Sequence, residues 1–91
     1  MAATGFDLEC RYALHPQVAV RPEPFGALLY HFGTRRLSFL KDPRLLEGVR
    51  GLSAAPSARA ACTAAGVAEP DLPRFAAALA TLADTHMLEA S

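Results

Sequence analysis

Apolar residues follow two different spacings along the chain, and the change between them lies near Lys41. Before it, short apolar runs at Tyr12–Leu14, Val18–Val20 and Gly26–Phe32 precede an alternating segment, Arg36–Leu40. After it, apolar residues recur every three or four positions. Alternation is typical of strands, and a spacing of three to four is typical of helices. The pattern therefore predicts a short antiparallel sheet followed by three helices.

The most apolar run, Gly26–Phe32, is expected to form a β-hairpin with Arg36–Leu40. Gly33 lies in the connection, and glycine accepts the positive φ that tight turns require. On the return strand Leu37 and Phe39 share one face, which we expect to be the core face. The other face, which is mixed, holds Arg36, Ser38 and Leu40.

Each predicted helix begins at a capping residue: Asp42 for the first, Ser57 for the second and Asp71 for the third. A proline in the first turn supports the first and third of these starts. Gly66 is expected to stop the second helix. In the third helix, apolar residues spaced by three and four define one buried face, which holds Leu72, Phe75, Ala76, Leu79, Leu82, Ala83 and His86.

The predicted fold class is α+β and winged-helix-like: a short three-stranded antiparallel sheet followed by a three-helix bundle. The Ala65-Gly66-Val67 connection between the last two helices resembles the turn of a helix-turn-helix. The chain has 91 residues, which is enough for one small domain. Residues 1–11 show no periodicity and are expected to be a flexible tail, and residues 12–91 are expected to form a single domain.

Charge argues against one class of partner. Nine basic and nine acidic side chains give a formal net charge of zero, which counts against non-specific binding to nucleic acid. The charges are unevenly placed, because residues 21–50 are predominantly basic and residues 63–91 are predominantly acidic. This asymmetry fits a role in attracting a partner, and it also fits ordinary solvated charge.

Groups suited to catalysis are missing from the sequence. Cys10 and Cys62 fit no metal-ligand spacing, and the three histidines form no metal pair. We expect His31 to be a partly exposed strand residue. No nucleophile motif or phosphate-binding loop is present, so we expect a protein that is not an enzyme and binds no cofactor or metal. With no signal peptide and no membrane-spanning run, a cytoplasmic protein that does not contact membranes is expected.

Two modes of binding fit this fold. In the first, the third helix reads DNA, as in a winged-helix DNA-binding regulator, but that helix presents Arg74 as its single basic side chain. In the second, the Arg36–Leu40 strand lies at an open sheet edge, to which an extended peptide adds as a further strand. Arg35 and Arg36 would then favour an acidic peptide. The DNA-binding regulator is the alternative to this peptide-binding function.

The stretch VRPEPFGALLY, Val20–Tyr30, together with the return strand Arg36–Leu40, resembles the mycofactocin-system peptide chaperones. These are relatives of PqqD-like domains, the recognition elements for leader peptides of ribosomally made, modified peptides. The resemblance covers about Tyr12 to Leu52 and implies a non-catalytic peptide-recognition domain over residues 12–91. Such a domain binds its precursor (leader) peptide as an added strand and presents it to a radical S-adenosylmethionine (SAM) maturase. The maturase carries the cofactors, so the resemblance implies none for this chain.

The resemblance also implies where the precursor peptide binds, namely between the third strand and the third helix. On the helix side it implies Arg74, Phe75, Ala78, Leu79 and Leu82. With the strand residues and the neighbouring Arg35, the expected peptide-binding residues are Arg35, Arg36, Leu37, Ser38, Phe39, Leu40, Arg74, Phe75, Ala78, Leu79 and Leu82.

Overall fold

The computed structural model describes residues 6–24 and 26–90 and contains one three-stranded sheet, one two-stranded ladder and three α-helices within those ranges. The order of the elements is β1 (Tyr12–Leu14), β2 (Val18–Glu23), β3 (Gly26–His31), β4 (Leu37–Leu40), α1 (Pro43–Gly51), α2 (Ala58–Ala64), α3 (Leu72–Asp84) and β5 (Leu88–Ala90). Short 3-10 turns follow α1 and precede α3. The predicted α+β class is confirmed, and the winged-helix likeness stays a prediction.

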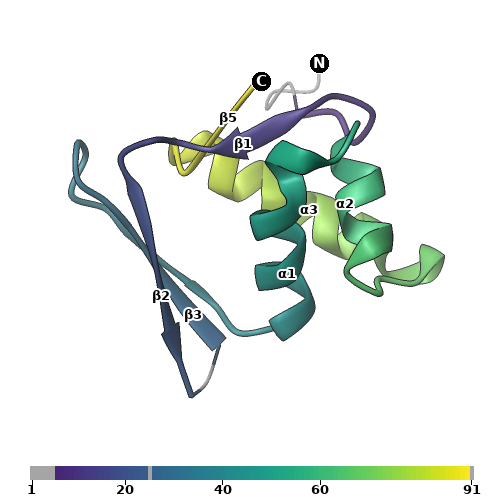
Figure 1. Ribbon diagram of the computed structural model, residues 1–91, viewed down its shortest axis with the longest axis horizontal. Coiled ribbons are helices and arrows are strands. Elements are labelled where there is room, and N and C mark those ends of the chain that lie inside the picture. The colour runs from purple at the N-terminus through teal and green to yellow at the C-terminus, as the bar shows by residue number, and fades with distance from the viewer. Residues whose placement is uncertain (1–5, 25, 91) are drawn as a thin grey trace.

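The three-stranded sheet has the order β2-β3-β4, and both of its pairings are antiparallel. A separate antiparallel ladder joins β1 to β5, with Leu14 opposite Leu88 (Figure 1). We did not expect β5, because a three-residue strand is too short to show an alternating pattern. Its pairing brings the segment after α3 back beside the segment before the sheet.

The hydrogen-bond register of β4 decides which of its backbone groups face β3. The His31 N–H donates to the Arg36 carbonyl at 3.0 Å, and Ser38 lies opposite Leu29. Hydrogen-bonded and non-hydrogen-bonded pairs alternate in an antiparallel ladder. Ser38 and Leu40 therefore direct their N–H and C=O groups toward β3. The N–H and C=O groups of Leu37 and Phe39 point toward the opposite edge.

The core face of β4 is the reverse of the one expected. Leu40 is 2% exposed, whereas Leu37 is 56% and Phe39 is 61% exposed. The reason is that α1 packs against β3 and β4 on the side that holds Leu29 and Leu40. Alternation shows which residues share a face, but the packing of a helix decides which face is covered.

The turn between β3 and β4 differs from the expectation in two respects. The residue with positive φ is Arg35, at 64°, and Gly33 does not take the left-handed region. His31 is only 3% exposed, so its expected partial exposure was wrong. Its Nδ1 accepts the N–H groups of Gly33 at 3.0 Å and Thr34 at 3.1 Å. The buried imidazole thus holds the turn by accepting two of its backbone N–H groups.

The start of β3 requires glycine. Gly26 has a φ of 144°, and a Cβ at this position would lie 1.9 Å from the Leu40 carbonyl oxygen. Both the backbone conformation and the close approach of β4 exclude a side chain there.

Gly26→Ala is therefore expected to lower the free energy of unfolding by about 3 kcal/mol, since it adds backbone strain and disrupts the β3–β4 pairing. Gly48→Ala in α1 is the matched control, because a Cβ there meets nothing within 4 Å. The control is expected to stabilise the protein by about 0.5–1 kcal/mol, since alanine is the better helix former. Urea denaturation measures both, and equal effects of the two substitutions would contradict this assignment.

The predicted helix boundaries are largely confirmed. The Asp42 side chain accepts the Arg44 N–H at 2.9 Å, and the Ser57 hydroxyl accepts the Ala60 N–H at 3.1 Å, as N-caps do. Gly66 follows α2 with a φ of 90°. Asp71 occupies the cap position of α3 without a bond from its side chain to the helix N–H groups. His86 lies beyond the end of α3 and is exposed, so its assignment to the buried face was wrong.

The segment before β1 contacts the start of α2. The carbonyls of Cys10 and Leu8 accept the N–H groups of Ala58 and Arg59 at 2.9 and 2.8 Å, which satisfies donors that a helix start leaves open. These contacts concern residues 6–11 of the expected tail, and residues 1–5 lie outside the described residues. The flexibility of the tail stays a prediction.

The hydrophobic core lies between the inner face of the sheet and the helices. Phe75 and Leu79 of α3 are 4% and 1% exposed, which confirms their predicted place in the core. Large side chains that are almost fully buried come from the sheet, from all three helices or their ends, and from the residue before β5: Leu29, Leu40, Val49, Leu52, Cys62, Leu79 and Met87.

Candidate peptide-binding groove

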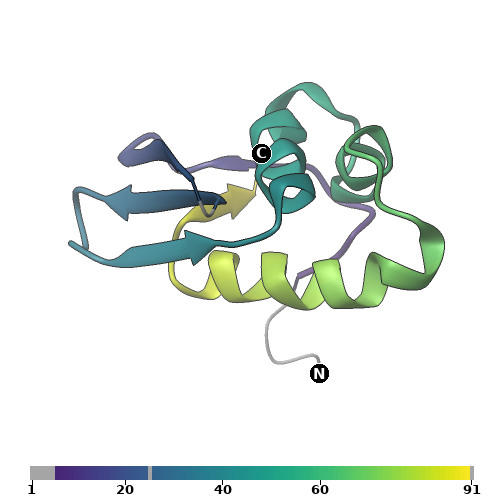
Figure 2. The same ribbon diagram turned by 90° about the horizontal axis from the view of Figure 1, so that it is seen from below.

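β4 is an edge strand. Within the described ranges it pairs with β3 on one side, and no strand pairs with its other side. On that other side lies α3, which runs antiparallel to β4 (Figure 2). Ala78 and Leu82 of α3 therefore border the same space as Ser38 and Leu40 of β4. A strand edge and a helix face together form the two walls of a cleft.

Two adjoining hollows make up this cleft, which we call the groove. The larger one, of about 320 Å³, is lined by Ser38, Phe39, Leu40, Leu45, Ala78, Thr81 and Leu82. The smaller one, of about 130 Å³, is lined by Asp42, Leu45, Arg74, Phe75 and Ala78. Leu45 and Ala78 line both hollows, so the hollows adjoin, and together their lining reaches from Arg74 in the first turn of α3 to Leu82 near its end.

The length of the groove matches a short extended segment. Arg74 and Leu82 are eight residues apart on α3, which corresponds to about 12 Å along the helix axis. An extended chain advances about 3.3 Å per residue, so about four residues span this distance. β4 itself has four residues. The groove therefore has room for one strand as long as β4.

The structure brings together most of the expected peptide-binding residues. Those that line the groove are Ser38, Phe39, Leu40, Arg74, Phe75, Ala78 and Leu82. Leu79 lies beneath the groove in the core. The Leu37 side chain lies on the exposed face of β4, opposite the face that holds Leu40. The N–H and C=O groups of Leu37 point toward the groove. Arg35 and Arg36 are exposed at the turn, beyond the residues that line the groove.

Three residues of the groove were not expected: Asp42, Leu45 and Thr81. In the sequence, Leu45 is one of the apolar residues that recur every three or four positions after Lys41, a spacing that indicates a helix and no binding site. Its side chain is half-buried because α1 crosses beneath the gap between β4 and α3. These positions can be identified only when the arrangement of α1, β4 and α3 in space is known. The sequence pattern of a single element does not contain that information.

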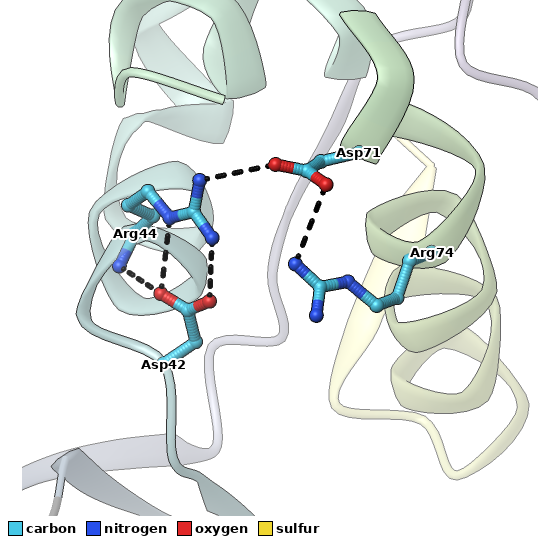
Figure 3. Close-up of polar contacts among 4 residues, drawn as sticks. All are labelled: Asp42, Arg44, Asp71 and Arg74. Atoms are coloured by element: carbon cyan, nitrogen blue, oxygen red, sulfur yellow. Dashed lines mark hydrogen bonds and ion pairs between the residues drawn. The ribbon is translucent and has the colours of Figure 1, made fainter. Parts of the chain in front are cut away.

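The end of the groove at the start of α3 is bordered by a charged network (Figure 3). Arg44 contacts Asp42 at 3.1 Å and Asp71 at 3.4 Å, and Asp71 contacts Arg74 at 3.6 Å. The guanidinium groups of Arg44 and Arg74 also lie over the Phe75 ring, 5.1 and 5.5 Å from its centre. The network joins the starts of α1 and α3, which are the two helices that border this end.

The Asp42 carboxylate makes stability depend on pH. The hydrogen bond from the Arg44 side chain, followed by the bond from the Arg44 backbone, lowers the pKa of Asp42 below its ordinary value of 3.8. A carboxyl group whose pKa is lower in the folded state stabilises the fold above its ordinary pKa. This contribution is lost as the pH falls through the folded-state pKa.

Asp42→Asn keeps a capping side chain but removes this charge. We expect the variant to be less stable than the wild type at neutral pH, and we expect the difference to shrink below pH 3.8. Denaturation curves over a series of pH values measure the difference. A difference that stays constant down to strongly acidic pH would show that the Arg44 contacts do not favour the charged carboxylate.

The opposite edge of the sheet is largely closed. The Phe32 N–H donates to the Gln17 carbonyl at 2.9 Å, so the alternation directs the backbones of Val18, Val20 and Pro22 away from β3. The Val18 N–H already donates to the His15 carbonyl at 2.9 Å, and proline has no N–H. Among these three positions only Val20 offers a donor to a further strand. β4 is therefore the more open of the two sheet edges.

The described residues contain neither a cluster of three or more His, Cys, Asp or Glu that could hold a metal ion nor a helix long and apolar enough to cross a membrane. Cys62 is buried, and burial raises the pKa of its thiol, which disfavours the reactive thiolate. The groove thus combines an open backbone edge, apolar walls and charged side chains, which are features of binding.

Comparison with known proteins gives the family. The model of the peptide chaperone MftB family matches residues 11–89, which include every residue that lines the groove. The chain belongs to the peptide chaperone MftB family. This is the mycofactocin-system chaperone family that Val20–Tyr30 and Arg36–Leu40 resemble. Membership makes the chain a peptide chaperone and not an enzyme.

Curated relatives agree with the family match. The chain is similar to the peptide chaperone MftB of Mycobacterium ulcerans, at 56% identity over 86 residues, and to that of Mycobacterium tuberculosis, at 55% over 86 residues. Both matches cover 94% of this chain and 79% of the relative. The Mycolicibacterium smegmatis chaperone is 54% identical over 83 residues, which cover 91% of this chain and 81% of that protein. No solved structure matches the chain.

Proposed function

We propose that this chaperone binds a ribosomal precursor peptide by strand addition to β4 and presents it to a radical SAM maturase in mycofactocin biosynthesis. The observation that supports this proposal is an edge strand that lies beside an apolar groove of matching length. Strand addition needs both parts, because backbone hydrogen bonds supply affinity and side-chain pockets supply selectivity.

The bound peptide forms a fourth strand of the sheet, between β4 and α3. Its backbone pairs with groups such as the Leu37 N–H and C=O, which point away from β3. Successive side chains of a strand alternate between faces, so two peptide residues at positions i and i+2 face the groove. These two side chains enter the two hollows, whose apolar walls at Leu45, Phe75 and Leu82 favour aliphatic residues.

Electrostatics supports a peptide with acidic residues. Arg35 and Arg36 are exposed at the turn end of β4, and neither forms an ion pair with another described residue. Exposed charges of this kind accelerate association with an oppositely charged partner and are screened by salt. We therefore place the acidic residues of the precursor peptide at this end.

The chemistry of modification belongs to the maturase. The chaperone supplies position: it holds the leader part of the precursor as a strand and leaves the remainder for the enzyme. We propose that this takes place in the cytoplasm, where both cysteines remain reduced. The DNA-binding alternative gains no support, because Arg74, the basic residue of α3, is engaged with Asp71 and Phe75.

Calorimetric titration of the chain with its precursor peptide tests the proposal, with a scrambled peptide of the same composition as the control. We expect one peptide per chain, weaker binding at high salt and at least tenfold weaker binding of the scrambled peptide. Equal binding of both peptides would refute sequence-specific recognition.

A titration with mixed-sequence duplex DNA at low salt tests the alternative, and no binding is expected.

A further inference from the structure

The outer face of the sheet is an exposed apolar surface that, apart from Phe39, lies outside the groove. Residues that lie opposite each other on neighbouring strands share a face of the sheet. Tyr30 lies opposite both Ala19 and Leu37, and Leu28 lies opposite Phe39. These side chains are on the side of the sheet away from α1. We call Ala19, Leu28, Tyr30, Phe32, Leu37 and Phe39 the outer face. Among the described residues, the large apolar side chains that are more than half exposed are Phe32, Leu37 and Phe39, at 59%, 56% and 61%.

The helices do not cover this surface. The helices lie to one side of the sheet, and α1 contacts the inner face, which holds Leu29 and Leu40 (Figure 1). The Tyr30 and Phe32 rings contact each other edge to face, 5.1 Å apart, so part of the outer face is already ordered. Clustered exposed aromatic and aliphatic residues on a small protein mark an interaction surface.

The charge of the sheet region indicates the partner of the outer face. Residues 18–41 carry four cationic side chains and one carboxylate, Glu23, which contacts Arg21 at 2.8 Å. The remaining chain carries five cationic and eight acidic side chains. Two copies that met through their outer faces would bring like charges together, which disfavours a dimer through this face. The complementary partner is a protein with an apolar patch bordered by carboxylates.

We propose that the outer face is the docking surface for the maturase, an inference that rests on the proposed function. A peptide strand added to β4 widens the sheet, and its outward side chains extend the outer face by one strand. A maturase bound there contacts the chaperone and its peptide together. Peptide and maturase therefore strengthen each other's binding, and the two coupling factors are equal because binding linkage is reciprocal.

The test uses residues of the outer face that do not belong to the groove. Ala19→Glu combined with Phe32→Ser places a carboxylate on the outer face and removes an exposed ring. We expect affinity for the maturase to fall at least about tenfold and affinity for the precursor peptide to change less than about twofold. Thr63→Glu, which adds the same charge at an exposed position of α2, is the matched control and should bind both partners as the wild type does.

The other outcomes each overturn the proposal. If the double variant binds the maturase as tightly as the wild type, the outer face is not the docking surface. If the double variant keeps its binding to the maturase but no longer binds phosphatidylglycerol-containing vesicles, the outer face binds a membrane. If it keeps its binding to the maturase but no longer self-associates in sedimentation, the outer face binds a second copy of the chain. A wild-type chain that binds the peptide but not the maturase would exclude this partner, and failure to bind the peptide would refute the proposed function itself.

Discussion

Replacing Ala78 by phenylalanine is expected to abolish binding of the precursor peptide in a protein that still folds. Ala78 lines both hollows of the groove and is half-buried, so a large ring at this position occupies the space that the peptide needs. The ring extends into an open groove and not into the core, and its cost in helix propensity is about 0.5 kcal/mol. We expect calorimetry to show at least a hundredfold loss of affinity, which corresponds to about 2.7 kcal/mol.

Ala77→Phe provides the matched control. Ala77 is the exposed neighbour of Ala78 on α3 and does not line the groove. The same ring at this position should leave peptide affinity within about twofold of the wild type, since it enters no binding contact. If the two variants bind the peptide equally well, the groove beside α3 is not where the peptide lies.

The second large effect is expected from Leu37→Pro compared with Leu37→Ala. Leu37 begins β4, and its N–H points away from β3, so proline is tolerated there by the sheet. Both substitutions remove the leucine side chain, and only proline removes the N–H. A peptide carbonyl that loses its donor costs about 1–3 kcal/mol, so the proline variant should bind about ten- to a hundredfold more weakly than the alanine variant.

Ser38→Pro tests the register in the opposite sense. The Ser38 N–H points toward β3, so proline at this position should disrupt the β3–β4 hairpin and reduce the cooperativity of unfolding. Circular dichroism and thermal unfolding separate this loss of structure from a loss of binding. Should Leu37→Pro and Leu37→Ala bind the peptide with equal affinity, the Leu37 N–H takes no part in recognition.

Local signals predicted the helices well. The cap at Asp42, the cap at Ser57 and the stop at Gly66 depend on side chains and backbone conformations within a few residues, and the structure confirms each of them. Asp71 occupies the expected position, but its carboxylate turns to Arg44 and Arg74 instead of capping the helix. A capping motif predicts where a helix starts, but it does not report competition for the carboxylate from Arg44 of another helix or from Arg74 one turn further on.

Long-range packing accounts for what the sequence could not predict. Leu37 and Phe39 were expected in the core because they alternate with polar positions, but α1 covers the other face of the strand. His31 was expected to be partly exposed, and it is buried because the turn that follows folds over its Nδ1. β5 exists only because β1 is available as a partner.

The groove was only partly predictable for the same reason. Most of the strand and helix residues that the family resemblance implied line the groove, but Thr81 of α3 was not among them. Leu45 at its base belongs to α1 and Asp42 at its end is the N-cap of α1, an element that no peptide-binding pattern had implicated. Leu79 was expected to contact the peptide, but it lies one layer below, in the core.

Hydrogen exchange at single amides of β4, measured by NMR with and without the precursor peptide, tests strand addition most directly. In the unbound chain the Ser38 and Leu40 amides should exchange slowly, because they face β3. On peptide binding the Leu37 amide should become protected, while the Val20 amide at the opposite edge of the sheet should be unaffected. A bound peptide that leaves Leu37 exchange unchanged, or that protects Val20 instead, would contradict strand addition at β4.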